Sequence, residues 1–402
     1  MKIQMKRNIR KEKIYILKRK IKAMAYSLLF MLCRVFPIKN DKICFSSFEG
    51  GGYSCNPKYI AEEIHNQNLN VQMIWFVKDM KKFFPSYIQP IKDTALNRAF
   101  YMSTSKIWID NSRQKYGTLK RKSQIYIQTW HGQIGFKPVG RLRGDKFSKI
   151  AMIVSQYDAK LIDIWLSNSK WSTDTFKKAF FGEPIFEIGS PRLDILLNVR
   201  GETKQRILDK TGLEPDCNYV IYAPTFRNGS QSTKRTVDKN LFSIEFDLLV
   251  KYLCEKMGGK WKVLLRLHPQ IALEMDNNEL FNSNDNVVDV SLYDDIYELL
   301  VISDVLVTDY SSVAFDALIG NKIVFIYADD HDEYVADRGD LLWNEANMPF
   351  KVCTCMSELR DAIDTFDERA YVKKMEKVKN ELGIIEDGKA SKRIVEIIKK
   401  II

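Results

Sequence analysis

The sequence predicts an α/β protein with two doubly wound domains that face a central cleft. Its 402 residues are long for a single core. Short runs of β-branched or aromatic residues alternate with amphipathic stretches along the chain. Strand alternating with helix is typical of parallel sheets built from βαβ units. In such domains ligands bind in the crevice outside the carboxyl ends of the strands.

The expected elements follow from these runs. The strands are expected at 43–48, 71–77, 107–110, 125–129, 220–223, 263–266, 305–308 and 323–326, and the helices at 57–65, 172–180, 246–256 and 294–302. The stretch 198–216 is polar and charged, so it is the expected domain boundary. We therefore expect an N-terminal Rossmann-like domain at 41–197, a C-terminal one at 198–380 and a final helix at 381–402.

Residues 1–40 form a basic segment ahead of the first domain. Basic residues fill positions 2–22, and an apolar run at 23–33 follows that is too short to span a bilayer. The segment resembles the start of a signal peptide, but no small-x-small cleavage site follows. We favour the first of two interpretations, an amphipathic arm that lies on an anionic membrane surface; the second is a basic helix packed on its own domain. The first predicts a peripheral protein at the cytoplasmic face of the membrane.

The net charge of +11 implies an anionic partner, which is nucleic acid, phospholipid or a phosphate-rich substrate. Nucleic acid is disfavoured because the polar motifs follow strands instead of forming one basic stripe with interleaved aromatics. The seven cysteines are odd in number and scattered, as in a protein with reduced thiols. P-loop, dinucleotide, zinc-protease and nucleophile-elbow motifs are all missing from the sequence.

Phosphate-capable groups follow four of the expected strands, at 129–132, 223–227, 268–269 and 308–312. The hydroxyls of 308–312 precede a helical pattern, and a helix N-terminus suits a phosphate. The alternative is ordinary N-capping by Ser311 or Asp309. Arg227 can grip a phosphate through two parallel bonds, and His268 can donate one more. Their alternatives are a solvated arginine and a structural histidine.

His131 lies between Trp130 and Gly132 at a strand end. Glycine permits close backbone approach by a ligand, and a histidine is a natural general base for a substrate hydroxyl. The alternative is a core histidine satisfied by a backbone carbonyl.

These segments resemble the CDP-glycerol glycerophosphotransferase family of teichoic acid synthesis. The matching motifs cover about 43–349: FSSFEG (45–50), YSCNP (53–57), QTWHG (128–132), GSPRLD (189–194), YAPTFR (222–227), RLHP (266–269), SDVLVTDYSS (303–312), and Tyr334 with Arg338-Gly339. The family often has Pro-Gly where Pro349-Phe350 stands, near the donor end, and Lys-Pro where Lys322-Ile323 stands. Because Pro349-Phe350 departs from the family pattern near the donor end, the identity of the transferred polyol stays open.

The resemblance implies a GT-B fold and assigns roles to named residues. His131 is the expected base, and His268 assists catalysis. The donor pyrophosphate is expected to contact Arg227, Thr225, His268, Thr308, Asp309, Ser311 and Ser312. The acceptor side is expected to include Glu49, Tyr53, Asn56 and Gly132.

The implied activity is transfer of a polyol phosphate, glycerol phosphate being favoured, from a CDP-activated donor to a hydroxyl of a lipid-linked teichoic acid or capsule precursor, with release of CMP. The alternatives are a CDP-ribitol-dependent transferase and a GT-B glycosyltransferase with a nucleotide-sugar donor. No protein-bound metal or cofactor is expected, although Mg²⁺ held through the substrate phosphates would leave little trace. The acceptor, the oligomeric state and the choice between one added unit and many stay open.

Overall fold

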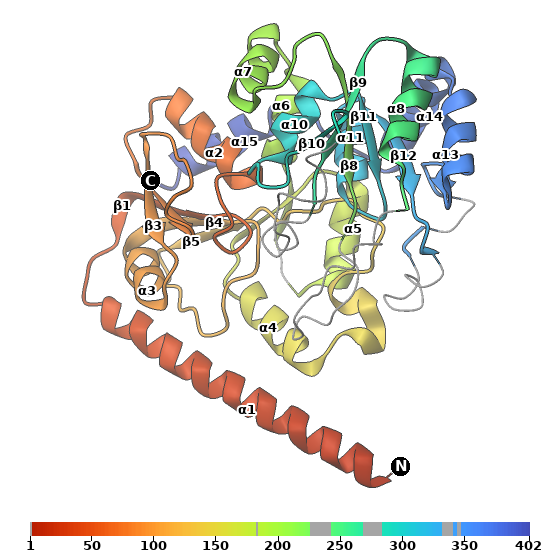
Figure 1. Cartoon of the computed structure of the whole chain (residues 1–402). Helices are drawn as coiled ribbons and strands as arrows, with labels where there is room; N and C mark the ends of the chain where they lie inside the picture. Colours follow the sequence, from red (N-terminus) through yellow and green to blue (C-terminus); the bar gives the residue numbers. More distant parts are fainter. Residues whose placement is uncertain (1, 182–183, 226–242, 268–283, 332–340, 344–346) are drawn as a thin grey trace. The chain divides into compact units, whose positions relative to one another are not determined.

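The computed structural model describes residues 2–181, 184–225, 243–267, 284–331, 341–343 and 347–402 (Figure 1). The chain forms two compact units. The first unit contains Met1–His131, Val139–Arg192 and Lys389–Ile402, and the second contains Gly132–Pro138 and Leu193–Gly388. The chain therefore passes between the units more than once.

A parallel sheet forms the centre of the first unit. Its strands are β1 (Lys39–Ser46), β2 (Gln72–Val77), β3 (Ile88–Lys92), β4 (Ser105–Asp110), β5 (Ile125–Gln128), β6 (Ile164–Ser167) and β7 (Ile185–Glu187), in the order β3-β2-β1-β4-β5-β6-β7. The helices are α1 (Lys2–Cys33), α2 (Cys55–Asn66), α3 (Ala95–Thr104), α4 (Lys149–Ala159), α5 (Lys170–Ala179) and α15 (Ala390–Lys399), with the 3-10 turns η1 (Gly140–Lys146) and η2 (Pro191–Leu193).

The two faces of this sheet carry separate apolar clusters, because successive side chains of a strand point to opposite faces. Phe45 packs in the cluster that also contains Ile60 of α2 and Ile394 of α15. Its neighbour Cys44 packs in the other cluster, with Phe30 of α1 and Phe176 of α5. Helices therefore cover both faces, as a parallel sheet requires.

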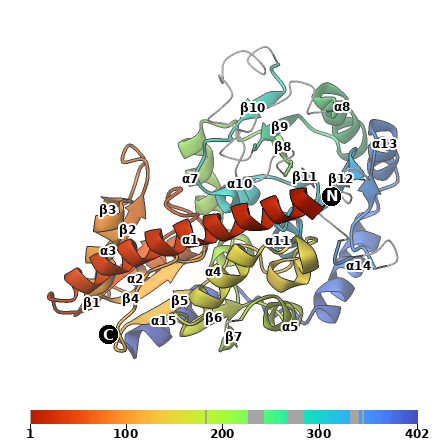
Figure 2. The same ribbon diagram turned by 90° about the horizontal axis from the view of Figure 1, so that it is seen from below.

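Helix α1 packs on the first unit along one side. Ala23, Tyr26, Phe30 and Cys33 are buried, at the three- and four-residue steps of one helix face. Ser27 donates a 2.8 Å hydrogen bond to the Gly117 carbonyl. Figure 2 shows α1 running alongside α3, which it contacts. The basic segment is thus a helix whose second half belongs to the core of its own unit, as the second of the two interpretations predicts.

The second unit repeats the design with another parallel sheet. Its strands are β8 (Asn218–Ala223), β9 (Trp261–Leu265), β10 (Val287–Asp289), β11 (Val305–Thr308), β12 (Ile323–Tyr327) and β13 (Val352–Cys353), in the order β10-β9-β8-β11-β12-β13. The described helices are α6 (Asp194–Leu197), α7 (Gly201–Thr211), α8 (Phe246–Met257), α10 (Ile296–Ile302), α11 (Val313–Ile319), α13 (Met356–Asp364) and α14 (Glu368–Glu381).

The strands and helices expected between 43 and 326 are present, with ends that differ by a few residues, whereas the helix expected at 381–402 is the shorter α15, Ala390–Lys399. The expected linker at 198–216 is instead largely α7, which buries Ile207 and Leu208 in the second unit. The chain changes unit just before it, between Arg192 and Leu193. The final segment does not stand apart either, because Ile394, Val395 and Ile398 of α15 are completely buried in the first unit.

Candidate functional site

The carboxyl ends of the central strands carry most of the predicted residues. In each sheet the strand order reverses direction once, between β1 and β4 in the first unit and between β8 and β11 in the second. Doubly wound sheets bind their ligands outside such reversal points. His131 follows β5, next to β4, and Thr308–Ser312 begin at the end of β11.

A backbone carbonyl holds the His131 ring in a defined tautomer. His131 Nδ1 lies 2.7 Å from the Asn111 carbonyl oxygen, which only accepts hydrogen bonds. Nδ1 therefore carries the proton in the neutral ring, and Nε2 keeps the lone pair. The ring packs between Trp130, at a centroid distance of 4.7 Å, and Phe48, at 5.5 Å. A fixed ring with a basic Nε2 is what a general base needs.

The surroundings also keep His131 neutral. Burial is the main effect that lowers its pKa from the usual 6.5, and the charges of Arg192 and Arg113 lower it further. The hydrogen bond to Asn111 and the charge of Glu49 act in the opposite direction. With the pKa lowered overall, the neutral ring predominates at physiological pH.

Asn111 links the loops after β1 and β4. Its Oδ1 accepts a 2.7 Å hydrogen bond from the Phe48 N–H, and its Nδ2 donates to Ser47 Oγ at 3.1 Å. Phe48 and Glu49 both have positive φ, at 46° and 56°, a conformation that non-glycine residues rarely adopt. Asn111 was not among the predicted residues, although it directly follows the strand expected at 107–110, where residues after a strand end are candidates for the site.

Asn56 holds the loop that precedes His131. Its fully buried amide donates to the carbonyls of Thr129, at 3.2 Å, and Trp130, at 2.9 Å. Its Oδ1 accepts a 3.0 Å hydrogen bond from the Arg192 N–H. Trp130 has a φ of 51°, so this bonding fixes a strained turn directly before the histidine. Asn56 thus positions His131 through the backbone.

The other two residues expected on the acceptor side of the first unit differ in exposure. Glu49 is exposed at the turn after β1. Tyr53 is buried: its ring packs against Trp75 and Phe84, and its hydroxyl lies 3.2 Å from that of Tyr87. The structure therefore brings Glu49 near His131 electrostatically and places Tyr53 in the core.

Gly132 begins the segment Gly132–Pro138, which belongs to the second unit. A side chain at Gly132 would lie 3.1 Å from Ser312 Oγ, so glycine lets this segment approach the start of α11 closely. Phe136, fully buried, packs against Phe315 at 4.9 Å and Phe350 at 6.0 Å. Phe350, one of the departures from the family motifs named above, thus fills this aromatic cluster.

Three of the predicted donor residues join the ends of β8 and β11. Thr308 is fully buried and its hydroxyl donates a 2.6 Å hydrogen bond to the Ala223 carbonyl. Asp309 Oδ2 accepts two hydrogen bonds from Thr225, at 2.8 Å from the backbone N–H and 2.6 Å from the hydroxyl. These contacts tie the segment that follows β8 to the end of β11, so the three residues hold the two strand ends together.

Ser311 and Ser312 are half-buried at the start of α11. The Asp309 carboxylate accepts hydrogen bonds from Thr225. Ser312 occupies the N-cap position of α11, and its side chain makes no capping hydrogen bond with the described residues. Next to them, the Tyr310 hydroxyl is hydrogen-bonded to His331 Nδ1. His331 was not among the predicted site residues, because nothing in its local sequence links it to Tyr310.

Arg227 and His268, with Tyr334 and Arg338, lie outside the described residues. In the part of the chain that is described, no group of three histidine, cysteine, aspartate or glutamate side chains is placed to hold a metal ion. Nor is any helix of that part long and apolar enough to cross a membrane.

Comparison with known proteins gives a consistent match. A family model described as CDP-Glycerol:Poly(glycerophosphate) glycerophosphotransferase matches residues 28–400. A teichoic acid poly(glycerol phosphate) polymerase from Staphylococcus epidermidis is 32% identical over 99% of this chain, which spans 55% of that relative's length. A polymerase of the same name from Bacillus spizizenii is 29% identical, over 96% of this chain and 99% of its own.

The solved structures agree with this match. A histidine-to-asparagine variant of the wall teichoic acid polymerase TagF, soaked with CDPG, is 29% identical to this chain. The alignment covers 98% of this chain and 97% of that one, with a TM-score of 0.79. The predicted fold class, an α/β protein with two Rossmann-like domains of the GT-B kind, is thereby confirmed.

Proposed function

Since the chain belongs to the CDP-glycerol:poly(glycerophosphate) glycerophosphotransferase family, we propose that it transfers glycerol phosphate from CDP-glycerol to a hydroxyl of a lipid-linked teichoic acid precursor. Glycerol is favoured over ribitol because both relatives described above are named for glycerol phosphate. Capsule precursors are acceptors of the same chemistry.

In the proposed reaction, the acceptor hydroxyl oxygen attacks the β-phosphorus of CDP-glycerol. The new phosphorus–oxygen bond forms as the bond to the CMP oxygen breaks, and CMP leaves with the bonding electron pair. The acceptor proton passes to His131 Nε2, whose lone pair is available because Nδ1 faces the Asn111 carbonyl. This hydrogen bond is the single observation that carries the proposal.

The donor phosphates are proposed to contact the second unit. Arg227 and His268 supply positive charge and hydrogen-bond donors, and Ser311 and Ser312 supply hydroxyls at the start of α11. Phosphoryl transfer depends mainly on positioning and on stabilising the charge of the phosphate oxygens. Thr225, Thr308 and Asp309 act by holding these loops in place.

The test is a donor panel. Purified protein is incubated with a lipid-linked acceptor and radiolabelled CDP-glycerol, CDP-ribitol or UDP-sugars, and the products are sized. We expect transfer from CDP-glycerol with one CMP released per unit added. Transfer from CDP-ribitol alone would show that the transferred unit is ribitol phosphate instead of glycerol phosphate. Transfer from a UDP-sugar alone would contradict the proposal. Parallel reactions with EDTA test whether Mg²⁺ bound through the substrate phosphates contributes.

We also propose that α1 holds the enzyme on the membrane where a lipid-linked acceptor lies. In addition to its buried side, α1 has an exposed apolar stripe, here called the outer stripe. Its residues follow one another at alternating three- and four-residue steps and are each 45–72% exposed: Ile14, Leu17, Ile21, Met24, Leu28 and Met31. At 100° per residue, exposed Lys18 and Lys22 border one side of the outer stripe and Lys13 and Lys20 the other. An apolar stripe between lysines is typical of helices that lie in the lipid interface.

Because α1 is part of the core, point substitutions test this better than deletion. Leu17→Gln with Leu28→Gln should weaken sedimentation with anionic vesicles and leave thermal stability unchanged. The matched control is Leu96→Gln with Val372→Gln, which changes equally exposed residues on other helices. Binding should also weaken with salt, since a Debye length of about 8 Å at physiological ionic strength screens the lysines. Undiminished vesicle binding of the stripe variant would exclude α1 as the anchor.

A further inference from the structure

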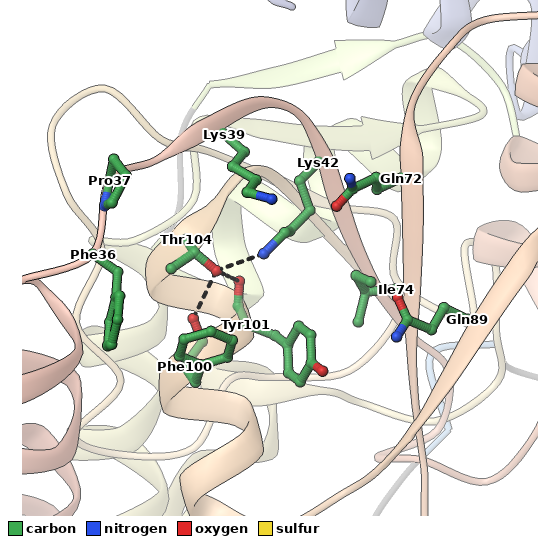
Figure 3. A pocket seen from close by; sticks show the side chains of 10 residues that line it. All are labelled: Phe36, Pro37, Lys39, Lys42, Gln72, Ile74, Gln89, Phe100, Tyr101 and Thr104. Carbon is green, nitrogen blue, oxygen red and sulfur yellow. Dashed lines mark hydrogen bonds between the residues drawn. The ribbon is translucent and has the colours of Figure 1, made fainter.

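A pocket lies at the amino-terminal ends of the strands of the first sheet, opposite to the ends that His131 follows. Its volume is about 280 Å³, and it is lined by the amino-terminal parts of β1 and β2 and by the end of α3 (Figure 3). His131 follows β5 at the carboxyl edge, so the pocket plays no part in the reaction proposed above. Its lining is basic and aromatic.

The main feature of this pocket is a buried ammonium group. Lys42 is 5% exposed, and its Nζ donates a 2.8 Å hydrogen bond to Thr104 Oγ1. Thr104 in turn donates to the Phe100 and Tyr101 carbonyls, at 2.9 and 3.2 Å, so it serves Lys42 as an acceptor. Within the described part of the chain, this is the hydrogen bond that the ammonium makes, and no ion pair with a carboxylate is found for it.

Aromatic rings and a second lysine complete the basic side of the pocket. Lys42 Nζ lies 5.6 Å from the Phe100 ring centre and 5.4 Å from that of Tyr101. The Lys39 and Lys42 side chains extend over the same space in Figure 3, and the charge of Lys39 adds to burial in lowering the pKa of Lys42. The charge of Asp41 acts in the opposite direction. Buried charges are normally paired, so the buried Lys42 ammonium, with the exposed Lys39 beside it and no carboxylate at ion-pair distance among the described residues, is a place for an anion.

The opposite wall offers neutral hydrogen-bonding groups. Gln72 and Gln89 line it with their side-chain amides (Figure 3). An amide both donates and accepts hydrogen bonds, which suits an alcohol more than a second charge. The pocket therefore combines groups for a phosphate with groups for hydroxyls.

The pocket adjoins the carboxyl end of α1. Phe36 lines it three residues after α1 ends at Cys33, and its ring packs edge-on against Phe100 at 5.3 Å. Phe36 is 47% exposed and Val35 is 80% exposed, so exposed apolar side chains lie beside the pocket as well as on α1. A ligand with a phosphate headgroup and an apolar tail matches this sequence of surfaces.

We propose that this pocket binds the headgroup of an anionic glycerophospholipid, with the phosphate on Lys39 and Lys42, the headgroup hydroxyls on the two glutamines, and the acyl chains over Phe36. The proposal rests on the membrane association proposed for α1, and it makes that association selective for a headgroup. A free glycerol phosphate shares the headgroup chemistry and is a separate arm of the test.

The experiment uses the full chain and short-chain lipids below their micelle concentration, so that no bilayer is needed. Calorimetry with dihexanoyl phosphatidylglycerol should show binding, with dihexanoyl phosphatidylcholine and inorganic phosphate binding at least about ten-fold more weakly. Lys39→Gln combined with Lys42→Met should weaken phosphatidylglycerol binding by at least about ten-fold. Lys373→Gln with Lys374→Gln removes the same charge from an exposed part of α14 and should have no effect.

The outcomes separate this proposal from the previous one. The variant Leu17→Gln with Leu28→Gln should lose vesicle binding and keep short-chain lipid binding. Should Lys42→Met lower the thermal stability, Lys39→Gln alone serves, because Lys39 is exposed. Glycerol phosphate binding as tightly as the lipid would overturn the lipid assignment. Unchanged phosphatidylglycerol binding in the lysine variants would overturn the site itself.

Discussion

The two units share one strand order for six of their strands and use the ends of those strands differently. In the first unit, buried amides and carbonyls hold a single ring: Asn111 fixes His131, and Asn56 fixes the turn before it. In the second unit, Asp309 and Thr308 tie two strand ends together and hold the loops around them. Under the proposed function, the same fold supports a proton acceptor in one unit and a phosphate-binding site in the other, and the loops after the strands determine the difference.

This comparison predicts that substitutions in the first unit change the rate and substitutions in the second change donor affinity. The largest effect is expected for His131→Ala, which should lower kcat by roughly 10²–10⁴-fold because the acceptor proton loses its base. Donor binding should persist. His65→Ala is the control, since His65 is exposed on α2 and stacks on Tyr87. Near-normal turnover of a folded His131→Ala variant would show that His131 is not the general base.

The next largest effect is expected for the donor residues. Arg227→Ala and His268→Ala should each weaken CMP or CDP-glycerol binding by roughly 1.5–3 kcal/mol, as for charge-assisted hydrogen bonds. Calorimetry with CMP measures this directly. Arg369→Ala, an exposed arginine of α14, controls for loss of charge. Unchanged affinity in both variants would count against a phosphate-binding site in the second unit.

A smaller effect is expected for Asn56→Ala. It removes three hydrogen bonds around the turn at Trp130, so His131 loses its exact placement and kcat should fall by about 10–10²-fold. CMP affinity should stay as in the wild type. Asn66→Ala, at the exposed end of the same helix, is the matched control. Weakened CMP binding with a normal kcat would contradict the assignment of rate to the first unit and of donor affinity to the second.

The smallest effect concerns pH. His131 accepts a proton only when neutral, and its lowered pKa puts the acid limb of kcat/KM below pH 6.5. The charge of Glu49 raises this pKa, so Glu49→Gln should move the limb to lower pH. Glu202→Gln, at an exposed position of α7, should leave the acid limb in place. An unmoved limb in Glu49→Gln would show that another group controls it.

Much of the fold was predictable because its central strands are long and buried. Strands such as β3 and β7 were missed because they are short or partly exposed: β7 has three residues, and Phe186 is 40% exposed. The segment Gly132–Pro138 was assigned to the wrong unit. Its placement depends on Phe136 packing against Phe315 and Phe350, which are about 180 residues or more away in sequence, so no local pattern could reveal it.

The sequence predicted where the site residues lie relative to the strands better than it predicted which groups they contact. The strand-end rule located His131 and Asp309, but it could not tell that the Thr308 hydroxyl faces the Ala223 carbonyl or that Tyr53 packs in the core. Both depend on which side chains a neighbouring strand or helix presents. The basic segment was predictable as a helix with an apolar side; that it has two, one buried and one exposed, emerges only when its partner α3 is in place.

The division of labour between the units is tested most directly by measuring single-turnover transfer and CMP affinity side by side in His131→Ala and Arg227→Ala. We predict that His131→Ala binds CMP like the wild type and transfers roughly 10²–10⁴-fold more slowly. Arg227→Ala should bind CMP weakly, and raising the CDP-glycerol concentration should restore its transfer rate more than it restores that of His131→Ala. The account is contradicted if His131→Ala loses as much CMP affinity as Arg227→Ala while its bound donor reacts at the wild-type rate.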